Sequence, residues 1–237
     1  MFEQFLGTLL FLLGFQRGGS VRGESTPSAI TSASNTSTAS AAKAAALLSA
    51  IKVHDIKAVN ATFLARLEKS QSLWETKRAS FSASLKAIHN EKKVTLMETI
   101  QNRLMEINKN QTTLLMNKLT FLSRALEQIK KAAEGFAVES GKDPSSVVAA
   151  IETANTAITD AISAVTIQAE KQYIISVSNE TTLKTNVEVQ KKLLVSDLKK
   201  VRDLVMNARK KVGDALKALK TYTGSSETLM ISTEETN

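Results

Sequence analysis

The chain has two histidines, His54 and His89, which are the first residues to test for metal chemistry. Zinc sites built from histidine place their ligands at short spacings such as His-x-x-x-His or His-Glu-x-x-His. Here the two histidines stand 35 positions apart, and neither spacing occurs. The chain also has no cysteine, which excludes thiolate metal sites, disulfides and cysteine nucleophiles. We therefore expect no metal site, and we interpret each histidine as a surface residue of a helix.

The segment from Gly135 to Lys142 (Gly-Phe-Ala-Val-Glu-Ser-Gly-Lys) is close to a phosphate-binding loop. The two glycines are one residue too far apart for that loop, and Asp143 replaces the hydroxyl group that would bind a metal ion. No predicted strand precedes the segment, and Glu139 would repel phosphate. We interpret the segment as a helix-terminating turn, and the sequence predicts no cofactor site.

Two pairs of acidic residues, Glu98 with Glu106 and Asp197 with Asp203, have the residue types of a general acid and base. Such pairs work when a pocket moves their pKa values apart, and thin helical bundles rarely form one. No Gly-x-Ser-x-Gly motif supplies a serine nucleophile. The sequence therefore predicts no catalytic residues and no enzyme.

Basic residues near the carboxyl end are candidates for contact with a polyanion. The formal net charge of +8 permits association with nucleic acid, anionic lipid or an acidic envelope polymer. Acids alternate with these lysines, and no aromatic residues stand among them for base stacking, so nucleic acid is disfavoured and a solvated helix face is the alternative. The candidate residues are Lys191, Lys192, Lys199, Lys200, Arg209, Lys210 and Lys211.

Helices must position all of these residues. The segment from Ser28 to Glu134 has no glycine and no proline, and its apolar residues recur at steps of three and four. Aromatic residues make up only 5% of the chain, which favours thin helix-on-helix packing over a sheet sandwich. The sequence predicts an all-α fold, an elongated antiparallel bundle or coiled coil of three to four long helices.

The first half of this bundle is predicted to start near Ala41. One seven-residue lattice joins Val53, Leu67, Trp74, Phe81 and Ile88, and Asn60 occupies a seam position on it, where a polar side chain fixes register. The stripe continues to Leu114 and then shifts phase to Leu115. A phase shift marks a stutter or a reversal between two helices, and residues 108–113 are the weakest helix formers nearby. We place the reversal there and end the second helix near Phe136.

The second half of the bundle has clearer boundaries. Asp143 before Pro144 predicts a helix start, and that helix extends to about Lys171. Residues 172–178 favour an extended connection. The last helix is predicted from Glu180 to Tyr222, and Gly224 ends it. Lys191 and the other candidate basic residues lie off its apolar stripe.

The two ends of the chain differ in composition from this body. Residues Phe5–Phe15 are apolar and have the length of a signal-peptide core, although Glu3 stands where lysine is expected and no small-x-small cleavage site follows. An uncleaved anchor and an apolar end that docks on the bundle are the alternatives. We predict four parts: 1–19 signal peptide or anchor, 20–40 Ser/Thr/Ala-rich linker, 41–223 bundle, and 224–237 acidic disordered tail.

Four short patterns in the carboxyl half carry a resemblance: Gln168-Ala169-x-Lys171-x-Tyr173, Glu180-x-Thr182-Leu183-Lys184, Asp197-Leu198-x-x-Val201 and Ala208-Arg209-x-x-Val212. They resemble uncharacterised exported helical proteins of ultrasmall candidate-phyla bacteria (Patescibacteria). The similarity covers residues 149–220 and, more loosely, residues 74–126. It implies a helical fold and export, and it implies no particular activity. The lysine-free start of this chain departs from the signal peptide that such proteins carry.

These observations lead to one main functional hypothesis and two alternatives. We expect a non-enzymatic, exported structural or adaptor protein of the cell envelope or surface, with a periplasmic, envelope-associated or extracellular location. Its expected partners are another protein or a second copy through the helices, or an anionic envelope polymer or lipid, and no small-molecule substrate. The alternatives are a holdase-type chaperone with clasping helices and, if the chain is not exported, a basic nucleic-acid-binding protein.

Overall fold

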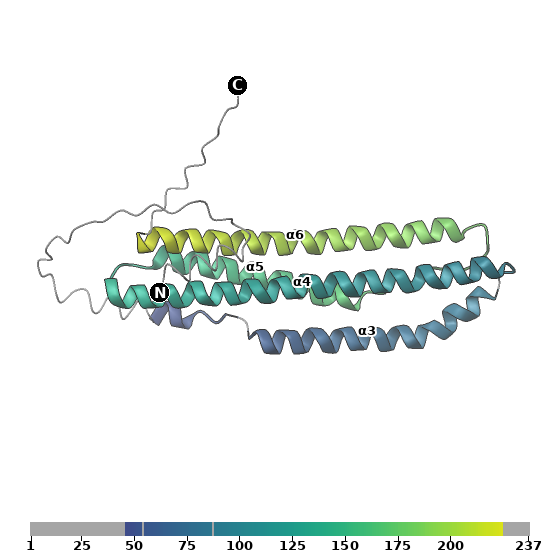
Figure 1. Cartoon of the computed structure of the whole chain (residues 1–237), viewed down its shortest axis with the longest axis horizontal. Helices are drawn as coiled ribbons and strands as arrows, with labels where there is room; N and C mark the ends of the chain where they lie inside the picture. The colour runs from purple at the N-terminus through teal and green to yellow at the C-terminus, as the bar shows by residue number, and fades with distance from the viewer. Residues whose placement is uncertain (1–45, 54, 87, 225–237) are drawn as a thin grey trace, which may run out of the picture. The chain divides into compact units, whose positions relative to one another are not determined.

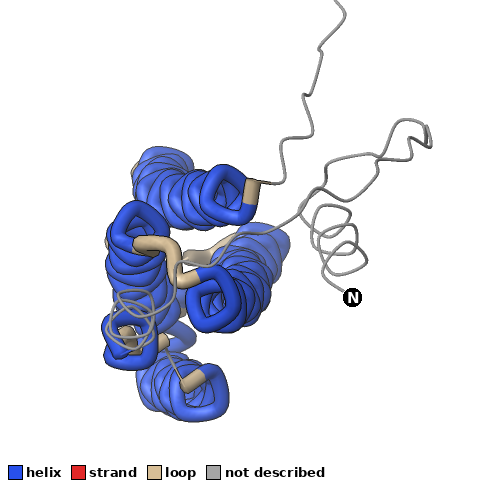
Figure 2. The backbone as a smooth tube through the Cα atoms, turned by 90° about the vertical axis from the view of Figure 1, so that its left-hand side faces the viewer, coloured by secondary structure: helices blue, strands red, loops and turns tan. Residues whose placement is uncertain are grey.

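The computed structural model describes residues 46–53, 55–86 and 88–224, and its helices confirm the all-α prediction. They are α3 (Ile56–Leu85), α4 (Glu91–Ser140), α5 (Ser145–Glu170) and α6 (Leu183–Thr223), preceded by a short helical segment at residues 46–50 (Figure 1). No strand occurs among the described residues, as Figure 2 shows. The long helices α3, α4 and α5 pack antiparallel in a bundle. The predicted signal or anchor, the linker, His54 and the tail beyond Gly224 lie outside the described residues.

Helix α3 starts later than the sequence pattern predicts. The side chain of Asp55 accepts hydrogen bonds from the backbone N–H groups of Lys57, at 2.9 Å, and Ala58, at 3.3 Å. This is an N-cap, which satisfies amide groups that have no partner within the helix. The first long helix therefore begins at Ile56, later than the start near Ala41 that the sequence predicts, because residues 51–55 are not helical where described.

The predicted reversal at residues 108–113 is also wrong, because α4 runs without interruption through this segment. The chain turns instead at residues 86–90, between α3 and α4. Asn108 and Thr112 are buried on the packed face of α4, with 3% and 0% of their surface exposed. With these polar residues included, the buried stripe has no phase shift: Met97, Gln101, Leu104, Asn108, Thr112, Leu115, Leu119, Leu122 and Leu126 follow at steps of three and four.

Helix α4 ends at Ser140, four residues beyond Phe136, near which the sequence pattern predicts its end. Gly135 is inside the helix, and the helix ends at Ser140, before Gly141. Gly141 has φ 66°, a left-handed conformation that glycine adopts without a Cβ clash, and its N–H donates to the carbonyl of Ala137 at 3.1 Å. Asp143 then caps α5, because its carboxylate accepts from the N–H of Ser145 at 3.0 Å. The segment is the helix-terminating turn that the sequence predicts.

The chain divides into two compact units, of which unit 1 comprises residues 1–52, 127–151 and 214–237. Its described part packs small and aliphatic side chains, with Leu48, Ala133, Val147 and Leu219 fully buried. Tyr222 donates a hydrogen bond to the carbonyl of Lys142 at 3.0 Å. Burial raises the pKa of Tyr222, so its hydroxyl group stays protonated and remains a donor.

Unit 2 comprises residues 53–126 and 152–213 and holds all of α3 with parts of α4, α5 and α6. Its core is one cluster of buried side chains: Phe81, Leu85, Ile88, Met97, Leu104, Tyr173, Ile175, Leu183, Leu194 and Leu198. Tyr173 and Ile175 come from the segment between α5 and α6, residues 171–182, which we name the connector. The predicted extended connection is confirmed. The connector contributes core residues although it is not a helix.

Candidate functional site

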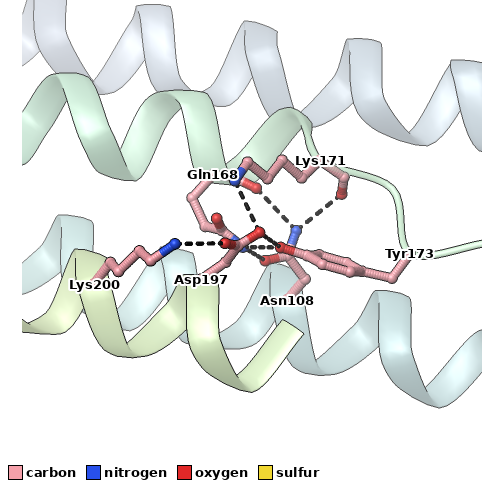
Figure 3. A network of polar contacts seen from close by, with 6 residues as sticks. All are labelled: Asn108, Gln168, Lys171, Tyr173, Asp197 and Lys200. Carbon is pink, nitrogen blue, oxygen red and sulfur yellow. Dashed lines mark hydrogen bonds and ion pairs between the residues drawn. The ribbon is translucent and has the colours of Figure 1, made fainter. Parts of the chain in front are cut away.

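A buried polar network lies in unit 2 where α4, α5, α6 and the connector meet (Figure 3). The hydroxyl group of Tyr173 donates to Asp197 Oδ2 at 3.0 Å and accepts from Gln168 Nε2 at 2.6 Å. Gln168 Nε2 also donates to Asn108 Oδ1 at 2.9 Å. Each of these four side chains is at least nine-tenths buried. Buried polar groups are costly unless they are hydrogen-bonded, and here they bond to one another.

Asn108 joins α4 to the end of α5. Its Nδ2 atom donates to the carbonyls of Gln168, at 3.0 Å, and Lys171, at 3.1 Å. The last carbonyls of a helix have no partner within that helix, so an amide group from a neighbouring helix can satisfy them. Asn108 therefore caps α5 from outside, which fixes where α5 ends and the connector begins.

Gln101, two turns earlier on α4, holds the connector itself. Its Nε2 atom donates to the carbonyl of Tyr173 at 3.1 Å, and its Oε1 atom accepts from the N–H of Ile175 at 2.9 Å. The primary amide thus pairs with the extended backbone as a neighbouring strand would. Because the backbone groups of a buried connector need such partners, one glutamine allows residues 173–175 to lie in the core without a sheet.

Charges complete the network at Asp197. Lys171 Nζ lies 2.8 Å from Asp197 Oδ2, and Lys200 Nζ lies 3.8 Å from Oδ1. Burial of the carboxyl group favours its neutral form, but the hydrogen bonds from Lys171 and Tyr173 outweigh burial and lower the pKa of Asp197. Burial is the main cause that raises the pKa of Tyr173 well above its ordinary value. At neutral pH the carboxylate is charged and the phenol is protonated, so the network holds its protons in place.

The paired acids of the sequence analysis do not converge into an acid–base site. Asp197 is buried in the network, whereas Asp203 is exposed on α6. Glu98 and Glu106 are both exposed, and Glu106 pairs with Arg103 at 2.9 Å. Among the described residues, no group of three His, Cys, Asp or Glu side chains is arranged to hold a metal ion.

His89 is exposed in the turn between α3 and α4, and its backbone N–H donates to Glu180 Oε1 at 3.1 Å. The other oxygen of Glu180 accepts from Lys93 Nζ at 2.6 Å. The hydrogen bond from Lys93 is the main cause that lowers the pKa of Glu180. These contacts fasten the connector to the start of α4, and the imidazole of His89 takes no part in them.

The candidate basic residues of α6 are spread around the side of the helix that faces away from its buried stripe. Lys211 is half-buried and the other six are exposed. Lys191 and Arg209 lie on one row with two further exposed cations, Lys184 and Arg202, because successive members of this row are 7, 11 and 7 residues apart, close to two, three and two helical turns. The sequence analysis missed Lys184 and Arg202 because it looked for adjacent lysine pairs, although the helical spacing could have identified them.

The sequence analysis also missed the role of Gln101, Asn108 and Thr112. Their signal is that they continue a row of buried apolar residues at steps of three and four, with Met97 before them, Leu104 between Gln101 and Asn108, and Leu115 after them. Gln168 and Tyr173 belong to a pattern that carries the resemblance, but nothing in that pattern specifies their hydrogen bonds. The backbone carbonyl and N–H groups that these amides satisfy are 60 to 74 positions away in the chain.

Two findings complete the description of the site. No helix among the described residues has the length and hydrophobicity of a membrane span. Comparison with protein-family models, with curated proteins and with solved structures finds no match for this chain.

Proposed function

We propose that this chain is a non-enzymatic, exported structural or adaptor protein of the cell envelope or surface, which uses α6 to bind an acidic component there. In this proposal the helices act as a scaffold, and the buried network of Asn108, Gln168, Tyr173 and Asp197 keeps α6 in position. The network supports a scaffold role because its hydrogen bonds join α4, α5, α6 and the connector.

The observation that carries the proposal is the distribution of charge among the helices. Helix α6 has eleven lysines and arginines and four acidic residues, a net charge of +7 (11 − 4). The whole chain has a net charge of +8, and α5 has three acidic residues and no basic one, a net charge of −3. Helix α6 therefore has the largest positive charge of the four helices, since α3 has a net charge of +3 (5 − 2) and α4 of +2 (8 − 6).

Acidic residues on α6 neutralise only part of its positive charge. Asp197 is the one acid of α6 that is buried, and it already contacts Lys171 and Lys200. Glu188, Asp203 and Asp214 stand three or four positions from basic residues, which supports the helix but leaves its net charge at +7 (11 − 4). An acidic surface outside the bundle would be attracted to this charge over about 8 Å at physiological salt.

The proposal is tested by fractionation of the tagged full-length protein in the cells that produce it. We expect the protein in the envelope or extracellular fraction, and we expect rising salt to release the envelope-bound part. A variant with Lys191→Gln, Lys192→Gln and Lys199→Gln should be released at lower salt. The control variant with Lys57→Gln, Lys69→Gln and Lys77→Gln, which removes three exposed cations from α3, should be released like the wild type.

Two results would count against the proposal. A pool that stays wholly in the cytosol would end the claim of export. Equal release of the α6 variant, the α3 variant and the wild type would show that α6 is not the surface that binds the envelope.

A further inference from the structure

Helix α6 has a straight row of exposed residues beside its buried stripe. We name this row the basic stripe. All eight of its residues are exposed: Lys184, Glu188, Lys191, Val195, Lys199, Arg202, Met206 and Arg209. Each follows the previous one by three or four positions. Seven of the eight directly follow an apolar residue, and Lys191 follows Gln190. The basic stripe is therefore parallel to the helix axis and lies entirely in unit 2.

The geometry of the basic stripe fits a flat surface. From Lys184 to Arg209 it covers 25 steps along the helix, which is roughly 38 Å at 1.5 Å per residue. The average step is close to the helical repeat of about 3.6 residues, so the row does not wind around the helix. Within unit 2, α6 lies at an edge of the bundle in both views (Figures 1 and 2).

The chemistry of the basic stripe combines charge with exposed apolar groups. Five of its residues are basic and Glu188 is its single acid. Val195 and Met206 stand among the basic residues with 59% and 53% of their surface exposed. Cations beside exposed apolar side chains are the composition of helices that lie in a membrane interface, where phosphate groups meet acyl chains.

We infer that the basic stripe docks α6 lengthwise on an anionic lipid membrane surface, with Val195 and Met206 inserted between the headgroups. The inference rests on the proposed function, which assigns binding of an acidic component to α6, and it names that component as lipid. Lysine and arginine bind the headgroup phosphates by charge complementarity. The apolar side chains then insert between the headgroups. A zwitterionic surface would not attract the cations in this way, so it would not bring Val195 and Met206 to the membrane.

Two other occupants fit the basic stripe less well. A soluble acidic polymer would bind the cations but would leave Val195 and Met206 in water. A partner helix would need an apolar seam, and only two of the eight positions are apolar, whereas a coiled-coil seam is apolar at nearly every third or fourth position.

The first test measures how the purified full-length protein binds vesicles, by co-sedimentation. We expect binding to vesicles of phosphatidylglycerol and phosphatidylcholine and little binding to phosphatidylcholine alone. Cations near an anionic surface contribute about fivefold each to affinity, so Lys184→Gln, Lys191→Gln and Arg202→Gln together should weaken binding roughly a hundredfold. The control Lys192→Gln, Lys210→Gln and Lys211→Gln removes the same charge from other sides of α6 and should weaken binding by less than about tenfold.

The second test asks whether the apolar residues insert. Because the chain has no cysteine, a single Val195→Cys variant can carry an environment-sensitive fluorophore at one defined place. The neighbouring exposed residue Ser196 points to another side of the helix, and Ser196→Cys supplies the matched control. We expect a blue shift on anionic vesicles for the label at position 195 and none for the label at position 196.

The outcomes separate this inference from the proposed function. Binding to soluble polyglutamate with no binding to anionic vesicles would overturn the lipid inference and leave α6 as the surface that binds an acidic component. Equal loss of vesicle binding in both triple variants, or equal shifts of both labels, would overturn the docking of this stripe. Loss of envelope association on fractionation would count against the proposed function itself.

Discussion

At the scale of single residues, buried amide side chains decide where the helices end. Asn108 satisfies carbonyl groups of Gln168 and Lys171, and Gln101 pairs with the backbone of Tyr173 and Ile175. A buried polar group that loses its partner costs about 1–3 kcal/mol, more than a typical hydrogen bond contributes. These residues therefore matter through the backbone groups that they satisfy.

This account predicts that Asn108→Ala is strongly destabilising. Removal of the amide takes the contact with Asn108 from the part-buried carbonyl of Lys171, and it takes one of two partners from the carbonyl of Gln168 and from Gln168 Nε2. We therefore expect a loss of about 2–4 kcal/mol in the free energy of unfolding. Urea denaturation measures it. Asn102→Ala on the exposed side of the same helix is the control and should change stability by less than about 0.5 kcal/mol. Similar losses in both variants would show that helix propensity, rather than the network, sets the effect.

The charged part of the network predicts a dependence of stability on acid pH. The pKa of Asp197 is lower in the folded protein than in the unfolded chain, so folding favours the carboxylate. This contribution is fully present above the unfolded pKa of about 3.9 and is lost as pH falls through the folded value. We expect the stability difference between the wild type and Asp197→Asn to shrink as pH falls below about 4, as measured by urea denaturation across pH. A difference that stays constant with pH would contradict the assignment.

Tyr173 predicts the opposite dependence at alkaline pH. Burial raises its pKa in the folded protein, so its contribution is present below the unfolded pKa of about 10 and is lost as pH rises toward the folded value. Tyr173→Phe removes the titrating group. The wild type should therefore lose stability between neutral pH and about pH 11 by a larger amount than this variant. Parallel curves for the two proteins would count against a buried phenol.

At the scale of helices, the sequence predicts α5 and α6 better than it predicts α3 and α4. The α5 stripe of Val147, Ile151, Ala154, Ile158, Ala161 and Val165 is fully buried, as its spacing indicates. On α4, a pattern that counts only apolar residues breaks at Asn108 and Thr112, because their burial depends on partners far away in the chain. An apolar-only pattern therefore predicts a reversal here and places Leu114 on the core stripe, whereas α4 is continuous and Leu114 is exposed.

The position of the turn between α3 and α4 can be tested with proline. Asn110 lies in the interior of α4 and is exposed, so Asn110→Pro should cost about 3 kcal/mol or more through the lost hydrogen bond and the ring clash. Glu91 is the first residue of α4, where proline is tolerated, so Glu91→Pro should change stability by less than about 1 kcal/mol. Thermal and urea denaturation measure both. A larger loss of stability for proline at position 91 than for proline in the interior of α4 would instead support a turn at residues 108–113.

At the scale of the whole chain, fold class could be predicted from the sequence, whereas the arrangement of the basic stripe, which we propose as a binding surface, could not. Few aromatic residues, few glycines and regular apolar spacing are sufficient for an all-α bundle. The basic stripe depends on which side of α6 is buried. A list of lysines alone mixes residues such as Lys191 and Lys192, which are adjacent in sequence and face different directions. Net charge likewise gives no indication that α6 has the largest positive charge of the four helices.

The central claim, that the exposed side of α6 meets the envelope, is tested most directly by photo-cross-linking in living cells. Benzoylphenylalanine at Met206, on the basic stripe, should form adducts with envelope lipid after irradiation. The same group at Asn207, the next residue and also exposed, should form few. Lipid adducts at position 206 that exceed those at position 207 are the predicted result. Equal adducts at the two positions, or no envelope adduct at position 206, would contradict the account.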